Sequence, residues 1–403
     1  MLRIVRSRLV TTICITTLLT ASGCVSIQRD APAPAPHNYA QAQIQGFEHI
    51  RFWGDETPPY LNEMIAHQQR ALAANPAFNE RIDVLALSGG GADGAYGAGF
   101  MKGWTDRGDR PEFFMVTGIS TGALMAPFVF LGADYDDVLR RFYTQTQTRQ
   151  IATPRIFKGI FGGDAFASTA PLEHLLNEVV TPEVVARIAT ESRKGRLLFI
   201  GTTNIDAQRP MIWDIGRIAE SGNPYSAQLI RHIMLASASV PGGFPPARFT
   251  VTIDGKTAQE AHVDGGITQQ IFVYPPGLHL SDLVEHIGSV PQKNFWLVRN
   301  TKLNPEYEAV KLTVPAIGTR SVQTLIKYQG LADLYTIEGV ARRDDFKIHL
   351  TTVPASFSMR SKKVFDPKYM SALYNLGYKT VLSDSQWHSD NPQTELTLHS
   401  LYR

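Results

Sequence analysis

Short apolar runs alternate with amphipathic stretches along most of the chain. The runs that have the length and composition of buried strands are IDVLALS, FFMVTG, RLLFIGTTNID, MIWDIG, AHVDGG and FWLVRN. Apolar residues at helical spacing lie between them, over 61–74, 92–107, 121–131 and 170–180. Because strands and helices alternate, the pattern predicts an α/β fold: three layers, α/β/α, with a mostly parallel central sheet.

The two ends of the chain depart from this alternation. Residues 25–46 are rich in Pro, Ala and Gln and have no apolar period, which is typical of a semi-extended tether. Amphipathic helices are predicted near 321–341 and 369–382. The expected organisation is a leader at 1–23, a tether at 24–46, a helical lead-in at 47–81, the main α/β domain at 82–300, and a helical cover of that domain at 301–403.

The first 23 residues have the features of an export signal. Arg3, Arg6 and Arg8 precede a short apolar stretch, and TASGC then places small residues before Cys24. About twelve apolar residues are too few to span a bilayer. The stretch resembles a bacterial lipoprotein signal, with an ordinary secretory signal as the alternative.

The lipoprotein resemblance implies that Cys24 becomes a lipidated N-terminus. One or two acyl chains such as palmitate would anchor the protein to a membrane without a spanning helix. Val25 rather than an aspartate follows the cysteine. The resemblance therefore implies a lipid-anchored protein of the cell envelope, at the outer membrane of a Gram-negative bacterium.

Composition and charge narrow the class of protein. A hydrophobic content of 43% with 19% charged residues is typical of a globular chain. The only cysteines are Cys14 and Cys24, so a mature lipoprotein would hold no disulfide. Without the three leader arginines, 36 basic residues face 37 acidic ones and no basic patch stands out, which argues against a nucleic-acid partner. No protein partner is indicated.

Six glycines follow the first predicted strand, in GGGADGAYGAG. Gly89, Gly91 and Gly94 match the G-x-G-x-x-G spacing of dinucleotide-binding folds. That fingerprint also needs an acidic residue at the end of the next strand, where GIS stands instead. A phosphate-binding P-loop needs a Lys-Ser/Thr pair after the last glycine, where Ala95 and Tyr96 stand. A nucleotide is therefore disfavoured.

The second predicted strand ends in GISTG, a G-x-S-x-G motif centred on Ser120. In a strand-to-helix turn, this pattern lifts the serine hydroxyl clear of the chain, and Gly118 and Gly122 keep side chains out of a crowded corner. One crossover separates Gly91 from Gly118, so both loops should leave the same end of two parallel strands. N–H groups of the glycine loop could then stabilise an oxyanion formed when Ser120 attacks a carbonyl.

A nucleophilic serine needs a base, and the sequence offers an aspartate. No histidine after Ser120 lies in a motif that marks it as the base, and one crossover is too short to join the oxyanion loop and elbow of an α/β-hydrolase. Asp264 ends the strand-like run AHVDGG, where two glycines allow close approach to another backbone. A partly desolvated carboxylate can act as the base. His262, two residues earlier on the same strand face, is a candidate to tune it.

The motifs GGGADG, GISTG and DGG, in this order, resemble those of the patatin-like phospholipases. The stretches TTNIDAQRP and LASASVPGGFPP look like the same family, and the resemblance covers about residues 82–300. It implies a Ser–Asp dyad on a three-layer α/β/α fold, with Ser120 as nucleophile and Asp264 as base. The implied oxyanion loop is Gly89, Gly90 and Gly91. Asp93 stands where the family often has a basic residue.

The resemblance implies a serine lipid acyl hydrolase of the phospholipase A or lysophospholipase type. Its substrate would be a phospholipid or another acyl ester, and the chemistry requires no metal and no cofactor. Two alternatives stay open: the same dyad could act on small esters or thioesters or transfer the acyl group, or the chain could be a non-catalytic lipid-binding lipoprotein.

Overall fold

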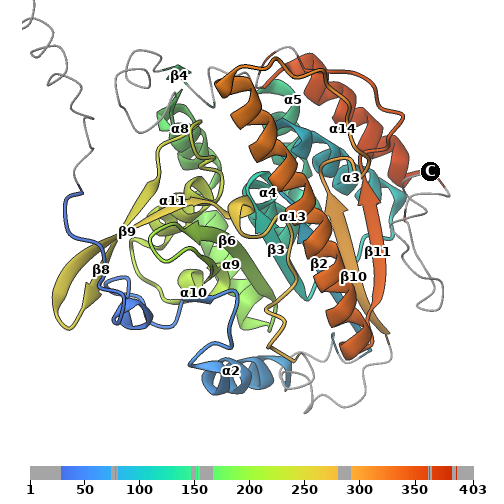
Figure 1. Ribbon diagram of the computed structural model, residues 1–403. Helices are drawn as coiled ribbons and strands as arrows, with labels where there is room; N and C mark the ends of the chain where they lie inside the picture. Colours follow the sequence, from blue (N-terminus) through green and yellow to red (C-terminus); the bar gives the residue numbers. More distant parts are fainter. Residues whose placement is uncertain are drawn as a thin grey trace, which may run out of the picture.

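The described part of the chain is built around one nine-stranded sheet with helices on both faces (Figure 1). The computed structural model describes residues 29–73, 78, 80–146, 151, 153–154, 167–279, 292–361, 363, 365–383 and 387. The expected leader and Cys24 lie outside these residues. None of the helices within them is long and apolar enough to cross a membrane.

The centre of the sheet is parallel. Its five strands, in spatial order, are β6 (Leu197–Asn204), β3 (Met115–Ile119), β2 (Arg81–Leu87), β10 (Gln292–Arg299) and β11 (Lys347–Thr352). The neighbouring strands β2 and β3 carry the two motif loops at the same end, so the one-crossover argument is confirmed. β11 was not predicted, and it adds a strand to the sheet from the region expected to be a helical cover.

The edge beyond β6 is antiparallel. β7 (Arg209–Asp214) pairs with β6, and β1 (Arg51–Trp53) pairs with β7. β9 (Lys256–Asp264) pairs with β8 (Ala247–Ile253) and, through its last three residues, with the end of β6. The short strands β4 (Thr153–Pro154) and β5 (Ala167–Ser168) form a separate pair. The predicted mostly parallel α/β fold is thus confirmed at its centre, with antiparallel additions on one side.

Two apolar clusters, one on each face of the sheet, make the three layers. Alternate residues of β2 divide between them: Leu85 and Leu87 pack in the cluster with α3 and α4, while Ile82, Val84 and Ala86 pack in the cluster with α13. Figure 1 shows α13 crossing in front of the parallel strands, with α3 and α14 behind. A helix layer on either face is the predicted α/β/α arrangement.

Ten α-helices are described, joined by short 3-10 turns. They are α2 (Leu61–Ala73), α3 (Gly94–Arg107), α4 (Thr121–Leu131), α5 (Asp136–Gln145), α8 (Ala170–Val179), α9 (Pro182–Arg193), α10 (Ile215–Glu220), α11 (Ser226–Ser237), α13 (Val314–Asp344) and α14 (Pro367–Val381). The 3-10 turns are η1 (Tyr39–Gln41), η3 (Gly91–Asp93), η4 (Ala133–Tyr135) and η5 (Gly265–Ile267). The predicted helix at 121–131 is confirmed with the same bounds, whereas α13 is longer at both ends than the expected 321–341.

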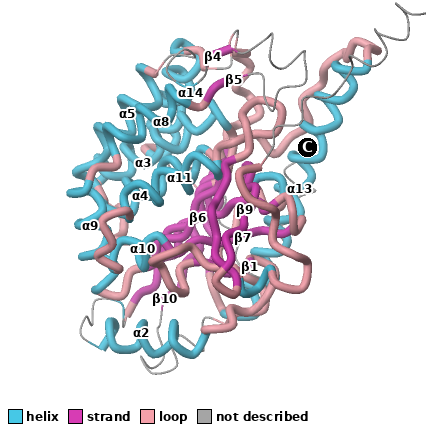
Figure 2. Tube along the Cα trace, turned by 90° about the vertical axis from the view of Figure 1, so that its left-hand side faces the viewer, coloured by secondary structure: helices cyan, strands magenta, loops and turns pink. Residues whose placement is uncertain are grey.

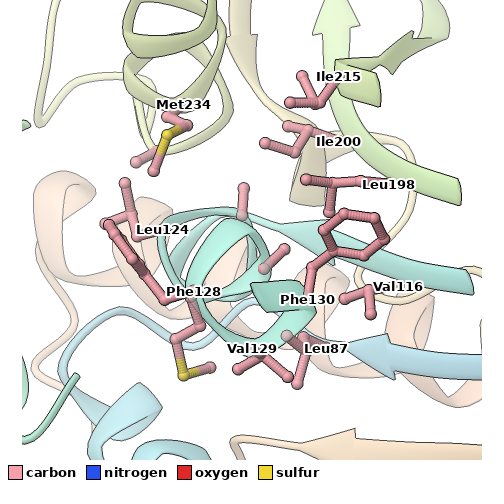
Figure 3. Packing of buried hydrophobic residues seen from close by; sticks show 14 of the residues in the cluster. Leu87, Val116, Leu124, Phe128, Val129, Phe130, Leu198, Ile200, Ile215 and Met234 are labelled. Atoms are coloured by element: carbon pink, nitrogen blue, oxygen red, sulfur yellow. The ribbon is translucent and has the colours of Figure 1, made fainter. Parts of the chain in front are cut away.

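The helix that follows Ser120 lies at the centre of one layer. All residues of α4 from Thr121 to Phe130 are buried, which is why this helix is apolar on every side. Figure 3 shows its Leu124, Phe128 and Phe130 among side chains from β2, β3 and β6. The start of α4, and with it the position of Ser120, is fixed by this packing.

The segment expected to be a tether packs against the fold over its described part, 29–46. Arg29 forms an ion pair with Asp206. Gln43 and Thr252 of β8 exchange backbone hydrogen bonds of 3.1 and 2.8 Å, and Ala42 is buried beside β8 and β9. From Arg29 onward the chain therefore differs from the expected free tether, because backbone pairing and apolar burial hold it on the β8–β9 hairpin.

Candidate active site

Ser120 lies at the turn from β3 into α4, in a strained backbone conformation. Its φ and ψ are 54° and −122°, an unusual region for a residue with a side chain. A Cβ on Gly122 would collide with the carbonyl of Leu87, and one on Gly118 would collide with the backbone of Gly122. The two glycines are thus required by the close approach of β2, β3 and α4, as the motif predicted.

The end of α11 supports this turn. The N–H of Ser120 donates to Oγ of Ser237 at 2.9 Å, and the Ser237 hydroxyl donates to the carbonyl of Gly201 at 2.6 Å. Ser237 therefore connects β3, β6 and α11, and it satisfies a buried donor that the sharp turn would leave without an acceptor. The sequence analysis did not single out Ser237, although it noted the stretch LASASVPGGFPP that contains it.

The structure brings Ser120 and Asp264 into direct contact. The Ser120 hydroxyl donates to Oδ2 of Asp264 at 2.6 Å, and the N–H of Gly266 donates to Oδ1 at 2.8 Å. Both side chains are nearly closed off, at 7% and 5% exposure. Each carboxylate oxygen is therefore held, and one of them is aimed at the serine.

Burial changes the proton affinity of this carboxylate. It raises the pKa of Asp264 from 3.8 to about 6, against the hydrogen bonds from Ser120 and Gly266, which lower it. At neutral pH the group is then mostly ionised, yet a much better proton acceptor than an exposed aspartate. This is the property that a general base needs.

His262 lies apart from the Ser120–Asp264 pair. One ring nitrogen contacts Oγ1 of Thr202 at 2.9 Å and the other contacts Oε2 of Glu260 at 3.1 Å. Glu260 is in turn paired with Arg51 of β1. The proposed tuning of Asp264 by His262 has no contact to support it, because the two His262 nitrogens bind within the buried network that joins β1, β6 and β9.

The glycine loop lies next to Ser120. A Cβ built on Gly89 would be 3.3 Å from Cβ of Ser120. The N–H of Gly89 donates to the carbonyl of Gln270 at 3.0 Å, whereas within the described part of the chain the N–H groups of Gly90 and Gly91 meet no acceptor. Both of these residues have positive φ, 150° and 57°. Of the three predicted oxyanion donors, Gly89 is engaged in holding the loop, and two are left for an anion.

Asn300, which follows β10, clamps the loop from its other side. Its Oδ1 accepts from the N–H of Gly97 at 3.1 Å, and its Nδ2 donates to the carbonyl of Ser88 at 2.8 Å. The Ser88 hydroxyl accepts from the Asn300 N–H at 2.9 Å and donates to the Gly89 carbonyl. Sequence reasoning missed Asn300, and its only signal was a polar residue ending the strand-like run FWLVRN.

Gln270 joins the glycine loop to the turn after Asp264 and to α13. Its side-chain amide donates to the carbonyl of Gly266 at 2.7 Å, and its own N–H donates to Oδ2 of Asp333 in α13 at 2.6 Å. Its carbonyl accepts from Gly89, as above. One residue thus fixes the spacing between the loop and the acid.

Asp93 occupies the position where a basic residue was expected. Its carboxylate accepts a hydrogen bond from the Tyr369 hydroxyl of α14 at 2.7 Å. Burial raises the pKa of Asp93 to about 6. The acid therefore anchors the start of α3 to α14. Among the described residues no group of three or more His, Cys, Asp or Glu side chains is placed to hold a metal ion.

Comparison with known proteins agrees with these motifs. Residues 85–275 match the sequence model of a family described as patatin-like phospholipase, and the matched segment contains the glycine loop, Ser120 and Asp264. Among solved structures, the crystal structure of VipD from Legionella pneumophila is similar at 13% sequence identity with a TM-score of 0.39, covering 77% of this chain and 68% of that chain. No curated protein sequence matches.

Replacing the buried carboxylate should stabilise the fold. The rise of the Asp264 pKa from 3.8 to about 6 means that the folded state disfavours the ionised form, so wild-type stability falls as the pH rises through that range. Above pH 6 the penalty is about 3 kcal/mol. Asp264→Asn should therefore raise the melting temperature at pH 8 and lose this advantage near pH 3.5, as thermal denaturation would measure.

The control for this measurement is Asp137→Asn. Asp137 is largely exposed and pairs only with Arg140 on the same helix, so its replacement should change the unfolding free energy by less than about 0.5 kcal/mol at either pH. A lower melting temperature for Asp264→Asn than for wild type at pH 8 would contradict the burial argument.

Proposed function

Residues 85–275 match the patatin-like phospholipase family, and on that basis we propose that the chain is a serine lipid acyl hydrolase in which Ser120 and Asp264 act as a catalytic dyad. The family supports ester hydrolysis on lipids in general terms. The observation that carries the dyad is the 2.6 Å hydrogen bond between the Ser120 hydroxyl and Asp264, made at a turn whose strained backbone presents that hydroxyl.

In the acylation half of the proposed reaction, Asp264 accepts the proton of the Ser120 hydroxyl as Oγ attacks the acyl carbonyl. The carbonyl electron pair moves onto its oxygen, which the N–H groups of Gly90 and Gly91 and the N-terminus of α3 stabilise. One such donor is worth about 3 kcal/mol of barrier. When the carbonyl re-forms, the alcohol leaves and takes the proton from Asp264, which leaves an acyl ester on Ser120.

In the deacylation half, a water molecule takes the place of the alcohol. Asp264 accepts a proton from the water, whose oxygen attacks the acyl carbon, and the oxyanion forms again at the glycine loop. Collapse breaks the bond to Oγ, and Ser120 recovers its proton from Asp264. The products are the fatty acid and the free enzyme. Over the two halves, protons move only between Asp264, Ser120, the leaving alcohol and the attacking water.

Two further activities remain candidates for the same geometry. Small esters or thioesters need the same proton transfers, and an acceptor alcohol in place of water would make the chain an acyltransferase. A non-catalytic lipid-binding role would leave the strain at Ser120 and the raised pKa of Asp264 without a function. These features favour catalysis.

The dyad is tested by a hydrolysis panel. Wild type should release fatty acid from phospholipid micelles and accept a fluorophosphonate label, Ser120→Ala should do neither, and Asp264→Asn should lose at least about 10²-fold in rate. Fatty-acid release and gel fluorescence measure the two outcomes. Ser383→Ala, an exposed serine, serves as the matched control and should keep full rate. Activity confined to short soluble esters would favour a hydrolase of small esters. Folded wild type that takes no label would contradict any catalytic role for Ser120.

The pH dependence follows from the buried acid. Because only ionised Asp264 can accept the proton, kcat/KM should fall about ten-fold per pH unit below a pKa of about 6 and level off above it. A pH–rate profile on a soluble ester, whose own ionisation does not change, measures this. A limb centred near pH 4, or activity that rises as the pH falls, would argue against Asp264 as the base.

We also propose that the chain is lipid-anchored through Cys24, at the outer membrane of a Gram-negative cell envelope. The support is the leader sequence, with its arginines, short apolar stretch and small residues before the cysteine. Cells grown with labelled palmitate should label wild type and leave Cys24→Ser unlabelled. Equal labelling of the two would refute the anchor at this residue.

A further inference from the structure

α13 divides into a packed half and a half that leaves the body of the fold. In the C-terminal half Leu331, Leu334, Ile337 and Val340 are buried against the sheet. Figure 2 shows the N-terminal half projecting outward. The helix spans Val314–Asp344, which is long for one whose first turns cover no core.

The side of α13 that is turned away from the sheet carries exposed apolar side chains. Among the described residues, eight of the fourteen exposed large hydrophobic side chains lie between 307 and 335. The exposed stripe comprises Val314, Ile317, Leu325, Tyr328 and Tyr335. At 100° per residue these five fall within about 80° of the helix circumference, opposite the buried face. Leu325 is 70% exposed and Val314 86%.

The helix that carries the stripe also contacts the candidate active site, from its buried face. Asp333, just past Tyr328, holds Gln270, whose carbonyl holds Gly89. From Asp333 the helix runs about 28 Å outward to Val314. Ile267, three residues after Asp264, is also 41% exposed. The helix that supports the candidate site through Asp333 therefore also carries the exposed stripe, on its opposite side.

The charge of this region favours an anionic partner. From 302 to 332 the chain has four basic residues, Lys302, Lys311, Arg320 and Lys327, against two acidic ones, Glu306 and Glu308, so four minus two leaves a net charge of +2. Arg320 and Lys327 also reach the loop before the helix, at Glu308 and at the carbonyl of Lys302. A helix with an apolar side, tyrosines and basic residues has the composition of an interfacial helix on anionic lipid.

We propose that the exposed stripe is a lipid-contact surface, by which the protein lies on an anionic bilayer with the Ser120 loops facing the lipid. Binding itself does not depend on catalysis, whereas its role in presenting substrate rests on the proposed function. A second copy of the chain is the less favourable occupant, because two stripes packed together would bring two regions of net positive charge near one another.

The test places a reporter on the stripe. In the full chain with Cys14→Ser and Cys24→Ser, Leu325→Cys carries an environment-sensitive fluorophore, and Thr190→Cys, exposed on α9 across the sheet, is the matched control. Mixed phosphatidylcholine and phosphatidylglycerol vesicles should shift the emission at 325 to shorter wavelength and leave that at 190 unchanged. An equal shift at both sites, or none at 325, would overturn the proposal. A shift at 325 that grows with protein concentration in the absence of vesicles would assign the stripe to a second copy.

A kinetic arm separates this inference from the proposed function. Leu325→Gln with Tyr328→Gln should slow hydrolysis of vesicle phospholipid at least about ten-fold, because two side chains lose their transfer into lipid, and leave hydrolysis of a short soluble ester unchanged. Equal loss on both substrates, or no loss on vesicles, would contradict the stripe's role. If wild type is inactive on both substrates but the reporter at residue 325 still shifts, the proposed hydrolase function is refuted and the lipid-contact surface stands.

Discussion

The site depends on one feature of strand pairing: β9 joins β6 at the position where β3 stops. Gly201 of β6 is paired with Ile119, the last residue of β3, and the next residue, Thr202, is paired with Asp264. Both partners lie on the same side of β6, since β7 occupies the other. Backbone register therefore brings Asp264 directly over the residue that follows β3, which is Ser120. The contact between their side chains is a consequence of the sheet, and loop flexibility has little part in it.

This arrangement is costly locally and is maintained by its surroundings. Ser120 has a positive φ, and Asp264 is ionised in a buried position, each of which destabilises the fold by an amount on the order of 1–3 kcal/mol. The supporting groups come from elements far apart in the chain: Ser237 at the end of α11, Asn300 after β10, and Gln270 against α13. Each satisfies a backbone group that the close approach of the loops would leave unpaired. The satisfied polar groups around the site therefore stabilise the strained backbone at its centre.

The local parts of this picture could be predicted from sequence and the long-range parts could not. The two glycine motifs predict their turns because only glycine fits where the strands and the helix approach closely. The bounds of α4 follow from its unbroken apolar run. The antiparallel entry of β9, the role of Asn300 and the engaged N–H of Gly89 depend on pairings across many residues, which leave no periodic signal. The part of α13 before residue 321 was also missed: this stretch contains Pro315 and Gly318, both poor helix formers, and it extends beyond the buried core.

The raised pKa of Asp264 and the proposed lipid contact of α13 are linked, because both concern how much water reaches the site. Burial raises the pKa of Asp264, so a site that opened widely to solvent for each substrate would lose the property that the proposed base needs. In the proposed lipid contact, a lipid that enters from a bilayer held against α13 would bring its own hydrocarbon to the site, near the partly exposed Ile267. Substrate entry would then exclude water rather than admit it. In the proposed arrangement the projecting helix affects the electrostatics of the site as well as membrane contact, because the bilayer that it binds is the medium that the open site would meet.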